Sequence, residues 1–323
     1  MKAIHIDKFG GPENLIIKSI PIPTPHPGEL LIKIKAFGLN HAETHMRRGE
    51  WAESVPISGI ECVGIVISCP GNEFPPHTKV AALMGGMGRT RPGSYAEYTV
   101  AAVENVVGLT TDVEWEVLGA LPESYVTAWT CLFRNLEVKR GQTVVIRGGT
   151  SGFGVAAVNL AVSAGVNVIA TTRSKGRFDK LLALGVTRVE IEGEGLSARL
   201  AETGSVDAVL DLVGNSTVLD SLKIVKRGGR VCIAGFLGGL APIRDFNPLA
   251  EMASGVHLSF FGSFVFGTQG FPVSDVPLQE IVDDVAAGKF SAKPARVFKF
   301  DEIVEAHRVM DANEANGKLV VVV

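Results

Sequence analysis

The sequence predicts an α/β protein in which a doubly wound parallel sheet is inserted into a mostly β domain. Short β-branched runs alternate with helical patterns from about residue 123 to residue 258, whereas residues 1–122 contain short apolar runs between Pro- and Gly-rich turns. Strands that alternate with helices favour parallel βαβ units with right-handed crossovers. The chain ends in KLVVVV, a strand that we expect to return to the first sheet. We therefore predict one domain from residues 1–122 plus 259–323 and a second from residues 123–258.

Composition limits the functional classes. A chain of 323 residues accommodates two domains, and 46% hydrophobic with 20% charged residues is typical of a globular protein. The net charge of −3 gives no reason to expect nucleic acid or an anionic membrane as partner. The N-terminus alternates polar and apolar residues, and no apolar run approaches the ~18 residues of a membrane span. We expect a cytoplasmic protein that binds a small molecule.

The first domain contains clear strand signals. In LLIKIKAFG, Ile32 and Ile34 alternate with Lys33 and Lys35, which predicts a half-buried strand. The turn PIPTPHPG precedes it. Further apolar runs predict strands at Leu30–Ala36 and Ile60–Ser68.

The second domain begins where proline opens a helix with an apolar stripe, in PESYVTAWTCLF. Strands are then expected at Thr143–Ile146, Asn167–Thr171, Asp207–Leu210 and Arg230–Ala234. Helices are expected at Gly154–Ser163, Arg177–Leu184 and Thr217–Lys226, and near the end of the chain at Asp301–Met310.

A glycine-rich turn follows the first of these strands, in VVIRGGTSGFGVAAVNLA. Gly152, Gly154 and Ala157 fit the dinucleotide-binding pattern G-x-G-x-x-G/A, in which glycines admit a pyrophosphate to the helix N-terminus. The predicted contacts are Gly149, Thr150, Ser151, Gly152, Phe153 and Gly154. Ser151 either stiffens this turn or bonds a phosphate through its hydroxyl. A tight turn without a ligand is the alternative.

The end of the second strand indicates which nucleotide binds. NAD-binding proteins carry an acid there for the ribose 2′-hydroxyl, but no Asp or Glu occurs from Gly141 to Phe178, whereas Arg147 and other basic residues do. A 2′-phosphate requires cationic and hydroxyl donors, so NADP(H) is the predicted cofactor. The predicted contacts are Thr172, Arg173, Ser174, Lys175 and Arg177. Alternatively, Lys175 and Arg177 belong to a solvated helix face.

Ligands of doubly wound sheets bind outside the carboxyl ends of the strands. This rule places Leu212, Val213 and Gly214 beside the adenosine, and Ala234, Gly235 and Phe236 beside the nicotinamide half. Ser263, Phe264 and Val265 are expected to wall the same pocket, although aromatic residues there are also compatible with a dimer interface.

Several motifs together resemble one family. They are MKAIHIDKFGGPENL, KAFGLNHAETHMRRG, PISGIECVGIV, GSYAEYTV, LPESYVTAWTCLF, the glycine-rich turn and NEANGKLVV. The chain resembles the zinc-independent medium-chain dehydrogenases/reductases of the quinone oxidoreductase (zeta-crystallin-like) group. The resemblance implies a GroES-like catalytic domain, an inserted Rossmann domain, an active site between them and a homodimer joined through the Rossmann sheets. It further implies that Thr127 contacts the nicotinamide amide and that Lys318, in the segment Asn316–Lys318, reaches the cofactor, where it could pair with a phosphate. The alternative for Thr127 is a hydrogen bond to the backbone carbonyl four residues earlier in its own helix.

The residues predict no metal. In zinc alcohol dehydrogenases a ligand cysteine stands where this chain has Asn40, and a ligand histidine stands where it has Ile60. No counterpart of their four-cysteine lobe occurs in Ala81–Tyr98. His41 and His45 are spaced for one helix face, but no third ligand accompanies them.

Without zinc, an electron-poor quinone or related conjugated carbonyl is the predicted hydride acceptor, because it needs mainly positioning. Asn40 is expected to donate a hydrogen bond to it, and His45, where the group commonly has tyrosine, to donate a proton. The alternatives are a capping role for Asn40 and a partly exposed polar role for His45. An enoyl or 2-alkenal double-bond reductase and a non-catalytic NADPH-binding protein remain the alternative functions.

Overall fold

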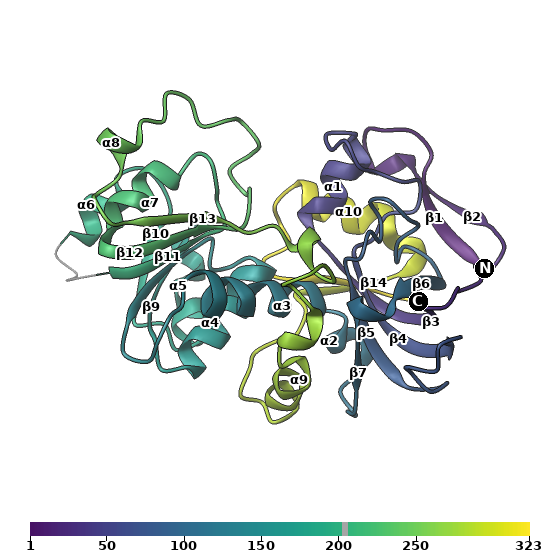
Figure 1. The fold of residues 1–323 in the computed structure, drawn as a ribbon. Coiled ribbons are helices and arrows are strands. Elements are labelled where there is room, and N and C mark those ends of the chain that lie inside the picture. The colour runs from purple at the N-terminus through teal and green to yellow at the C-terminus, as the bar shows by residue number, and fades with distance from the viewer. Residues whose placement is uncertain (202–205) are drawn as a thin grey trace. The chain divides into compact units, whose positions relative to one another are not determined.

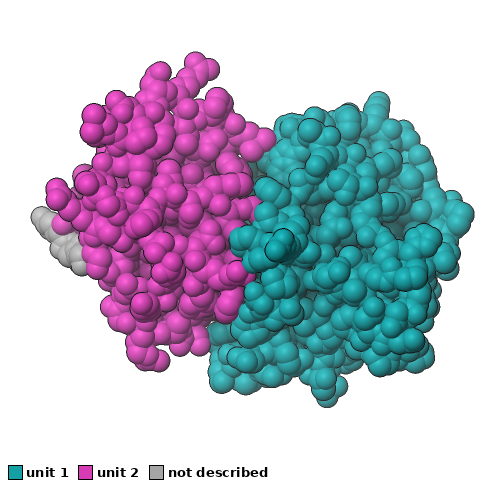
Figure 2. All heavy atoms as spheres, viewed as in Figure 1, with its two compact units in different colours: residues 1–126, 263–323 teal, residues 127–262 magenta. Residues whose placement is uncertain are grey.

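The computed structural model describes residues 1–201 and 206–323, which divide into two compact units (Figure 2). Unit 1 comprises residues 1–126 and 263–323, and unit 2 comprises residues 127–262. Both junctions lie four residues beyond the predicted boundaries at 122 and 258. Helix α3 (Pro122–Thr130) spans the first junction, and strand β13 (His257–Phe260) belongs to the sheet of unit 2. The predicted boundary at 258 would therefore have cut a strand.

Unit 1 is built on a 7-stranded sheet with the order β14-β15-β3-β4-β5-β7, in which β6 also pairs with β3 (Figure 1). The strands are β3 (Glu29–Leu39), β4 (Glu61–Ser68), β5 (Lys79–Leu83), β6 (Tyr98–Ala102), β7 (Val106–Leu109), β14 (Arg296–Lys299) and β15 (Leu319–Val322), with the separate hairpin β1 (Lys2–Ile6) and β2 (Leu15–Ser19). The helices are α1 (His41–Arg48), α2 (Trp115–Leu118), α9 (Leu278–Ala286) and α10 (Ile303–Asp311). The terminal strand β15 pairs antiparallel with β3, as predicted.

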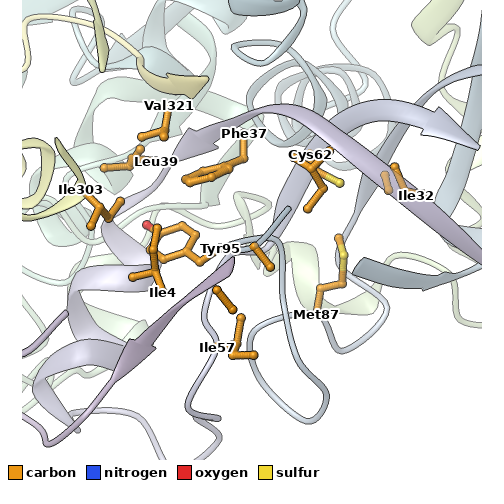
Figure 3. Close-up of a cluster of buried hydrophobic side chains, with 14 of the residues drawn as sticks. Ile4, Ile32, Phe37, Leu39, Ile57, Cys62, Met87, Tyr95, Ile303 and Val321 are labelled. Atoms are coloured by element: carbon orange, nitrogen blue, oxygen red, sulfur yellow. The ribbon is translucent and has the colours of Figure 1, made fainter. Parts of the chain in front are cut away.

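The alternation along β3 explains the core of unit 1. Ile32 and Ile34 are buried whereas Lys33 is exposed, which confirms the predicted half-buried strand. Phe37, further along β3, stacks on Tyr95 with ring centroids 4.8 Å apart (Figure 3). The Tyr95 hydroxyl lies 2.9 Å from Nε2 of buried His307. Burial lowers the pKa of His307 to about 3, so a neutral imidazole joins α10 to the core.

Unit 2 is a 6-stranded sheet with the order β10-β9-β8-β11-β12-β13, in which every pair is parallel. Its strands are β8 (Thr143–Arg147), β9 (Asn167–Thr172), β10 (Arg188–Ile191), β11 (Val206–Asp211), β12 (Val225–Ile233) and β13. The helices are α4 (Gly152–Ser163), α5 (Phe178–Leu182), α6 (Leu196–Leu200), α7 (Val218–Ile224) and α8 (Pro248–Glu251). This is the strand order of dinucleotide-binding doubly wound folds, so the predicted fold class is confirmed.

Several bounds of unit 2 differ from the predicted ones. The expected helix Thr217–Lys226 ends at Ile224, because Val225 already pairs with Val206 and begins β12. The expected helix Arg177–Leu184 is reduced to Phe178–Leu182 after a short 3-10 turn. Among the described residues, no helix is both long enough and apolar enough to cross a membrane.

Arg147, at the end of β8, is a fully buried charge of unit 2. Its guanidinium contacts the Glu192 carboxylate, Asp220 Oδ2 at 3.1 Å and Ser221 Oγ at 3.0 Å. Its side chain is 1% exposed and that of Glu192 is 7% exposed. Two buried opposite charges with hydrogen bonds to their remaining polar atoms stabilise one another, but either one alone is costly.

We therefore expect Arg147→Met to lower the free energy of unfolding by about 3–5 kcal/mol, because it leaves the Glu192 charge buried without its counter-ion. Denaturant unfolding of the full chain measures this. Arg227→Met is the matched control, since Arg227 is exposed. Equal stabilities of the two variants would contradict this role for the Arg147 network.

Candidate functional sites

The turn between β8 and α4 is closed by its own residues. Gly148 adopts a left-handed backbone with φ +79°, which glycine tolerates without a Cβ clash. Ser151 caps α4: its Oγ accepts from the Gly154 N–H at 3.0 Å and donates to the Gly148 carbonyl at 2.9 Å. The Ser151 hydroxyl is thus already used inside the turn. This geometry favours the stiffening role over direct phosphate bonding.

The same turn brings the start of α4 very close to the backbone. A Cβ on Gly154 would lie 2.3 Å from the Gly148 carbonyl oxygen, so only glycine fits there. Gly149 donates its N–H to Thr171 at 2.9 Å, which holds the turn against β9. The N–H groups of Gly152 and Phe153, in the first turn of α4, have no acceptor within the described part of the chain. They form the anion-binding end of a helix of 12 residues.

Basic and hydroxyl groups follow the end of β9. Arg173, Ser174 and Lys175 are exposed there, and Arg177 is half-buried. Across residues 1–201 and 206–323, none of the three basic residues forms an ion pair. Thr150 and Thr172 are buried, with their hydroxyls 3.5 Å apart. The predicted 2′-phosphate residues therefore lie together at one strand end, with their charges available.

No acid occurs near the end of β9 in the sequence, but the fold brings one there. Glu192 directly follows β10, and its N–H donates to Thr172 at 2.9 Å. Its carboxylate accepts from the Thr171 hydroxyl at 2.5 Å and pairs with Arg147. Arg147 therefore neutralises this acid within the unit. This corrects the inclusion of Arg147 among the cationic groups near a phosphate.

The loops that follow β11 and β12 meet at the same edge of the sheet. Buried Asp211 accepts from the N–H of Val213 at 3.0 Å and of Gly214 at 2.8 Å. A Cβ on Gly214 would lie 2.4 Å from the carbonyl oxygen of Gly235, so the two loops are in contact. This brings together five of the predicted contacts, namely Leu212, Val213, Gly214, Gly235 and Phe236. Thr127, on α3, is also buried.

In unit 1, Asn40 lies at the centre of a buried polar group. It is the N-cap of α1, where its backbone N–H donates to Glu43 Oε2 at 2.7 Å. Its side-chain amide donates to Glu61 Oε1 at 2.9 Å and accepts from Lys318 Nζ at 2.6 Å. Asn40 therefore has the capping role that was the alternative to substrate binding, and its side-chain amide also bridges Glu61 and Lys318.

Lys318 is turned into unit 1. Its ammonium lies 2.5 Å from Glu61 Oε1, and the two side chains are 8% and 0% exposed. A buried carboxylate requires a counter-charge, and Lys318 supplies it. This corrects the pairing of Lys318 with a cofactor phosphate.

Two further buried acids surround this pair. Burial, as the largest cause, raises the pKa of Glu43 to about 7 and that of Glu123 to about 8. The Glu123 N–H donates to Glu61 Oε2 at 2.8 Å, and the Ser263 hydroxyl bonds to the Glu123 side chain. Sequence reasoning missed Glu43 and Glu123 as site residues. The sequence did offer a signal for each: Glu123 is an acid within the largely apolar segment LPESYV, and Glu43 lies in the capping motif at the start of α1.

The remaining candidates of unit 1 have separate partners. His45 Nδ1 lies 2.5 Å from Glu50 Oε2, and its ring stacks on Trp51 at 5.6 Å. Burial lowers the pKa of His41 to about 4. Ser263, Phe264 and Val265 form a 3-10 turn in which Phe264 is 49% exposed. In the part of the chain that the structure describes, no three His, Cys, Asp or Glu residues are grouped to hold a metal ion.

Comparison with known proteins agrees with this architecture. The family model of the alcohol dehydrogenase GroES-like domain matches residues 26–111, and that of zinc-binding dehydrogenases matches residues 184–321. The quinone oxidoreductase of Mus musculus is 30% identical over 78% of this chain and 77% of its own length. The human quinone oxidoreductase is 26% identical over 99% of this chain and 97% of its own length.

Solved structures agree as well. The mycobacterial Rv1454c complexed with NADPH has a TM-score of 0.87 and 26% identity over the full length of both chains. The quinone oxidoreductase from Coxiella burnetii has a TM-score of 0.84 and 27% identity over 100% of this chain and 99% of its own. The chain belongs to the quinone oxidoreductase family of the medium-chain dehydrogenases/reductases.

Proposed function

We propose that this protein is an NADPH-dependent oxidoreductase that transfers a hydride to a quinone or related conjugated carbonyl acceptor, without zinc. The observation that carries the proposal is the anion-binding start of α4 beside the unpaired basic residues at the end of β9. Relatives named quinone oxidoreductases, and one solved with NADPH, support it. A reductase of enoyl or 2-alkenal double bonds is the alternative, as is a non-catalytic NADPH-binding protein.

The residues of unit 2 fit NADP(H). The free N–H groups of Gly152 and Phe153 would hold the pyrophosphate, since helix N-termini bind anions. Arg173, Ser174 and Lys175 would hold the 2′-phosphate through charge-assisted hydrogen bonds, with Arg177 nearby in sequence. The bound cofactor supplies the hydride. Glu192 does not repel the 2′-phosphate, because Arg147 already balances its charge.

The residues of unit 1 do not fit zinc, although one matching family model describes zinc-binding dehydrogenases. Zinc requires thiolate, imidazole or carboxylate ligands in one shell. The two matching positions carry Asn40 and apolar Ile60. The ammonium of Lys318 already neutralises Glu61 beside Asn40 and would repel a second cation.

On the acceptor side, we propose that Asn40 and His45 contact the substrate. The Asn40 amide is held rigidly between Glu61 and Lys318, which orients it. The His45 ring is oriented by Glu50 and Trp51. Oriented donors reduce the reorganisation needed when charge develops on a reduced oxygen.

The exposed edge of unit 2 supports a homodimer, which we also propose. Strand β13 is the last strand of the sheet, and its Phe260 is 53% exposed. An exposed apolar edge strand favours pairing with a second copy.

Arg173→Ala tests the phosphate site. We expect NADPH affinity to fall about tenfold or more while NADH affinity stays unchanged, because a lost charge-assisted hydrogen bond is worth about 1.5–3 kcal/mol. Fluorescence titration with both nucleotides measures this, and Arg227→Ala is the control on an exposed arginine of the same unit. Parallel losses for both nucleotides would show that another residue binds the 2′-phosphate.

An acceptor screen tests the reaction. We expect NADPH oxidation, followed by its absorbance, to be faster with quinones than with 2-alkenals, because a quinone needs little charge stabilisation. Preference for 2-alkenals would replace the proposed activity with double-bond reduction. Tight NADPH binding without turnover of either class would favour the binding protein.

Metal analysis tests the zinc-free assignment. We expect the purified full chain to contain far less than one zinc per molecule and to keep its turnover after chelation, because the ammonium of Lys318 contacts both the Asn40 amide oxygen and the Glu61 carboxylate and occupies the place that a second cation would need. One equivalent of zinc, lost together with activity, would overturn this assignment.

A further inference from the structure

The carboxyl cluster of unit 1, which we define as Glu43, Glu61 and Glu123 around the ammonium of Lys318, is not used by the proposed hydride transfer. Glu43 and Glu61 are 0% exposed and Glu123 is 8% exposed. They come from α1, from the start of β4 and from the first turn of α3. Three buried acids around one ammonium cannot all be ionised without a large desolvation cost.

The hydrogen bonds indicate which acid carries the charge. Glu61 accepts from the Lys318 ammonium, the Asn40 amide and the Glu123 N–H, at 2.5, 2.9 and 2.8 Å. Three donors, one of them cationic, stabilise an ionised carboxylate. The ammonium is thereby balanced by Glu61. A neutral cluster then requires that the other two acids hold protons.

Glu43 and Glu123 differ in their partners. Glu43 accepts two backbone N–H bonds, from Asn40 at 2.7 Å and Ile60 at 3.2 Å, which favour its charged form. Glu123 has the hydroxyl of Ser263 as a side-chain partner, and Ser263 is half-buried. A protonated Glu123 can donate to this hydroxyl, which can in turn donate outward.

The charges that face Glu123 agree with this assignment. Burial and then the charge of Glu61 raise its pKa to about 8, and Glu43 on α1 raises it further only when Glu43 is ionised. The Ser263 hydroxyl and the Lys318 ammonium act in the opposite direction and are outweighed. Glu123 therefore retains a proton at neutral pH and can release it to a more basic oxygen.

We propose that Glu123 stores the proton that completes reduction of the acceptor and that Ser263 passes it to the reduced oxygen. This proposal rests on the proposed oxidoreductase function and names the proton donor for it. In this proposal Glu123 is a proton-storing residue that acts through Ser263, and Ser263 contacts the acceptor together with Asn40 and His45.

The step balances. The acceptor gains the electron pair with the hydride, and its oxygen forms a new O–H bond with the Ser263 proton. The Ser263 oxygen takes the Glu123 proton, whose O–H bond breaks and leaves a carboxylate. Water returns a proton to Glu123. One NADPH and one proton are consumed for each acceptor that gains two hydrogens.

Glu123→Gln and Ser263→Ala test the relay, with Glu116→Gln as the control because Glu116 is an exposed acid of the same unit. Turnover with NADPH and the best quinone is measured against pH in H₂O and D₂O. Infrared spectroscopy of the folded full chain reports protonated carboxyl groups directly. It does not depend on activity.

We expect both relay variants to lose about 100-fold in kcat, the lower range for general acid catalysis, with little change in the KM for NADPH. Wild-type kcat should fall as pH rises through about 8, the pKa of Glu123, because the proton is lost there. Glu123→Gln should lack this fall. The wild-type protein should show protonated-carboxyl absorbance at pH 7 from Glu123 and Glu43; Glu123→Gln should lose the Glu123 part of it, whereas Ser263→Ala and Glu116→Gln should keep the whole.

Stability gives a second readout that a folding defect would not imitate. The raised pKa means that folding favours protonated Glu123, so wild-type stability is lost as pH rises from about 4.5 towards about 8. Glu123→Gln, always neutral, should lose less over this range. Its Tm relative to the wild type should therefore rise with pH.

The possible failures are distinguishable. No NADPH oxidation by the wild-type protein with any acceptor overturns the proposed function. Wild-type turnover that survives Glu123→Gln or Ser263→Ala within about twofold overturns only the relay. If the protonated-carboxyl absorbance of Glu123→Gln at pH 7 equals that of the wild-type protein, proton storage at Glu123 is likewise overturned.

Discussion

The ion pair between Lys318 and Glu61 is the interaction on which the polar centre of unit 1 depends. Its two residues lie at the starts of β15 and β4, and it holds the Asn40 side chain at the start of α1. Glu61 also accepts the first-turn N–H of Glu123. A buried ion pair adds little net stability over an apolar pair of similar shape. Its physical effect is positional, because two strands and two helix starts converge on one carboxylate.

Unit 2 uses the same principle at its own functional loop. Arg147 balances Glu192, Glu192 accepts from the Thr171 hydroxyl, and this hydroxyl accepts from the Gly148 N–H at 3.0 Å. The turn between β8 and α4 is thus held by a chain of hydrogen bonds that ends in a neutralised buried charge. Such a network is strong when every member is satisfied and costly when one is removed.

These two networks change the chemical picture. Lys318 and Arg147 were both predicted to lie near a phosphate, yet each is the counter-ion of a buried acid. We propose the exposed residues Arg173, Ser174 and Lys175 for the 2′-phosphate instead. In unit 1, one ammonium balances only one of three buried acids, so the others favour their protonated forms. The proton that reduction requires is then held by the protein itself and is not taken directly from water.

Much of this protein was determined by its local sequence. The period-two pattern of β3, the alternation of strands and helices, and the glycines of the α4 turn act through neighbouring residues, so fold class and nucleotide loop follow from them. The partners of charged residues do not. Glu192 is 45 residues from Arg147, and Lys318 is 257 residues from Glu61; only the folded chain brings them together. The burial of these charged side chains, which the local sequence around each of them does not specify, decided which acids keep a proton and which cations remain exposed.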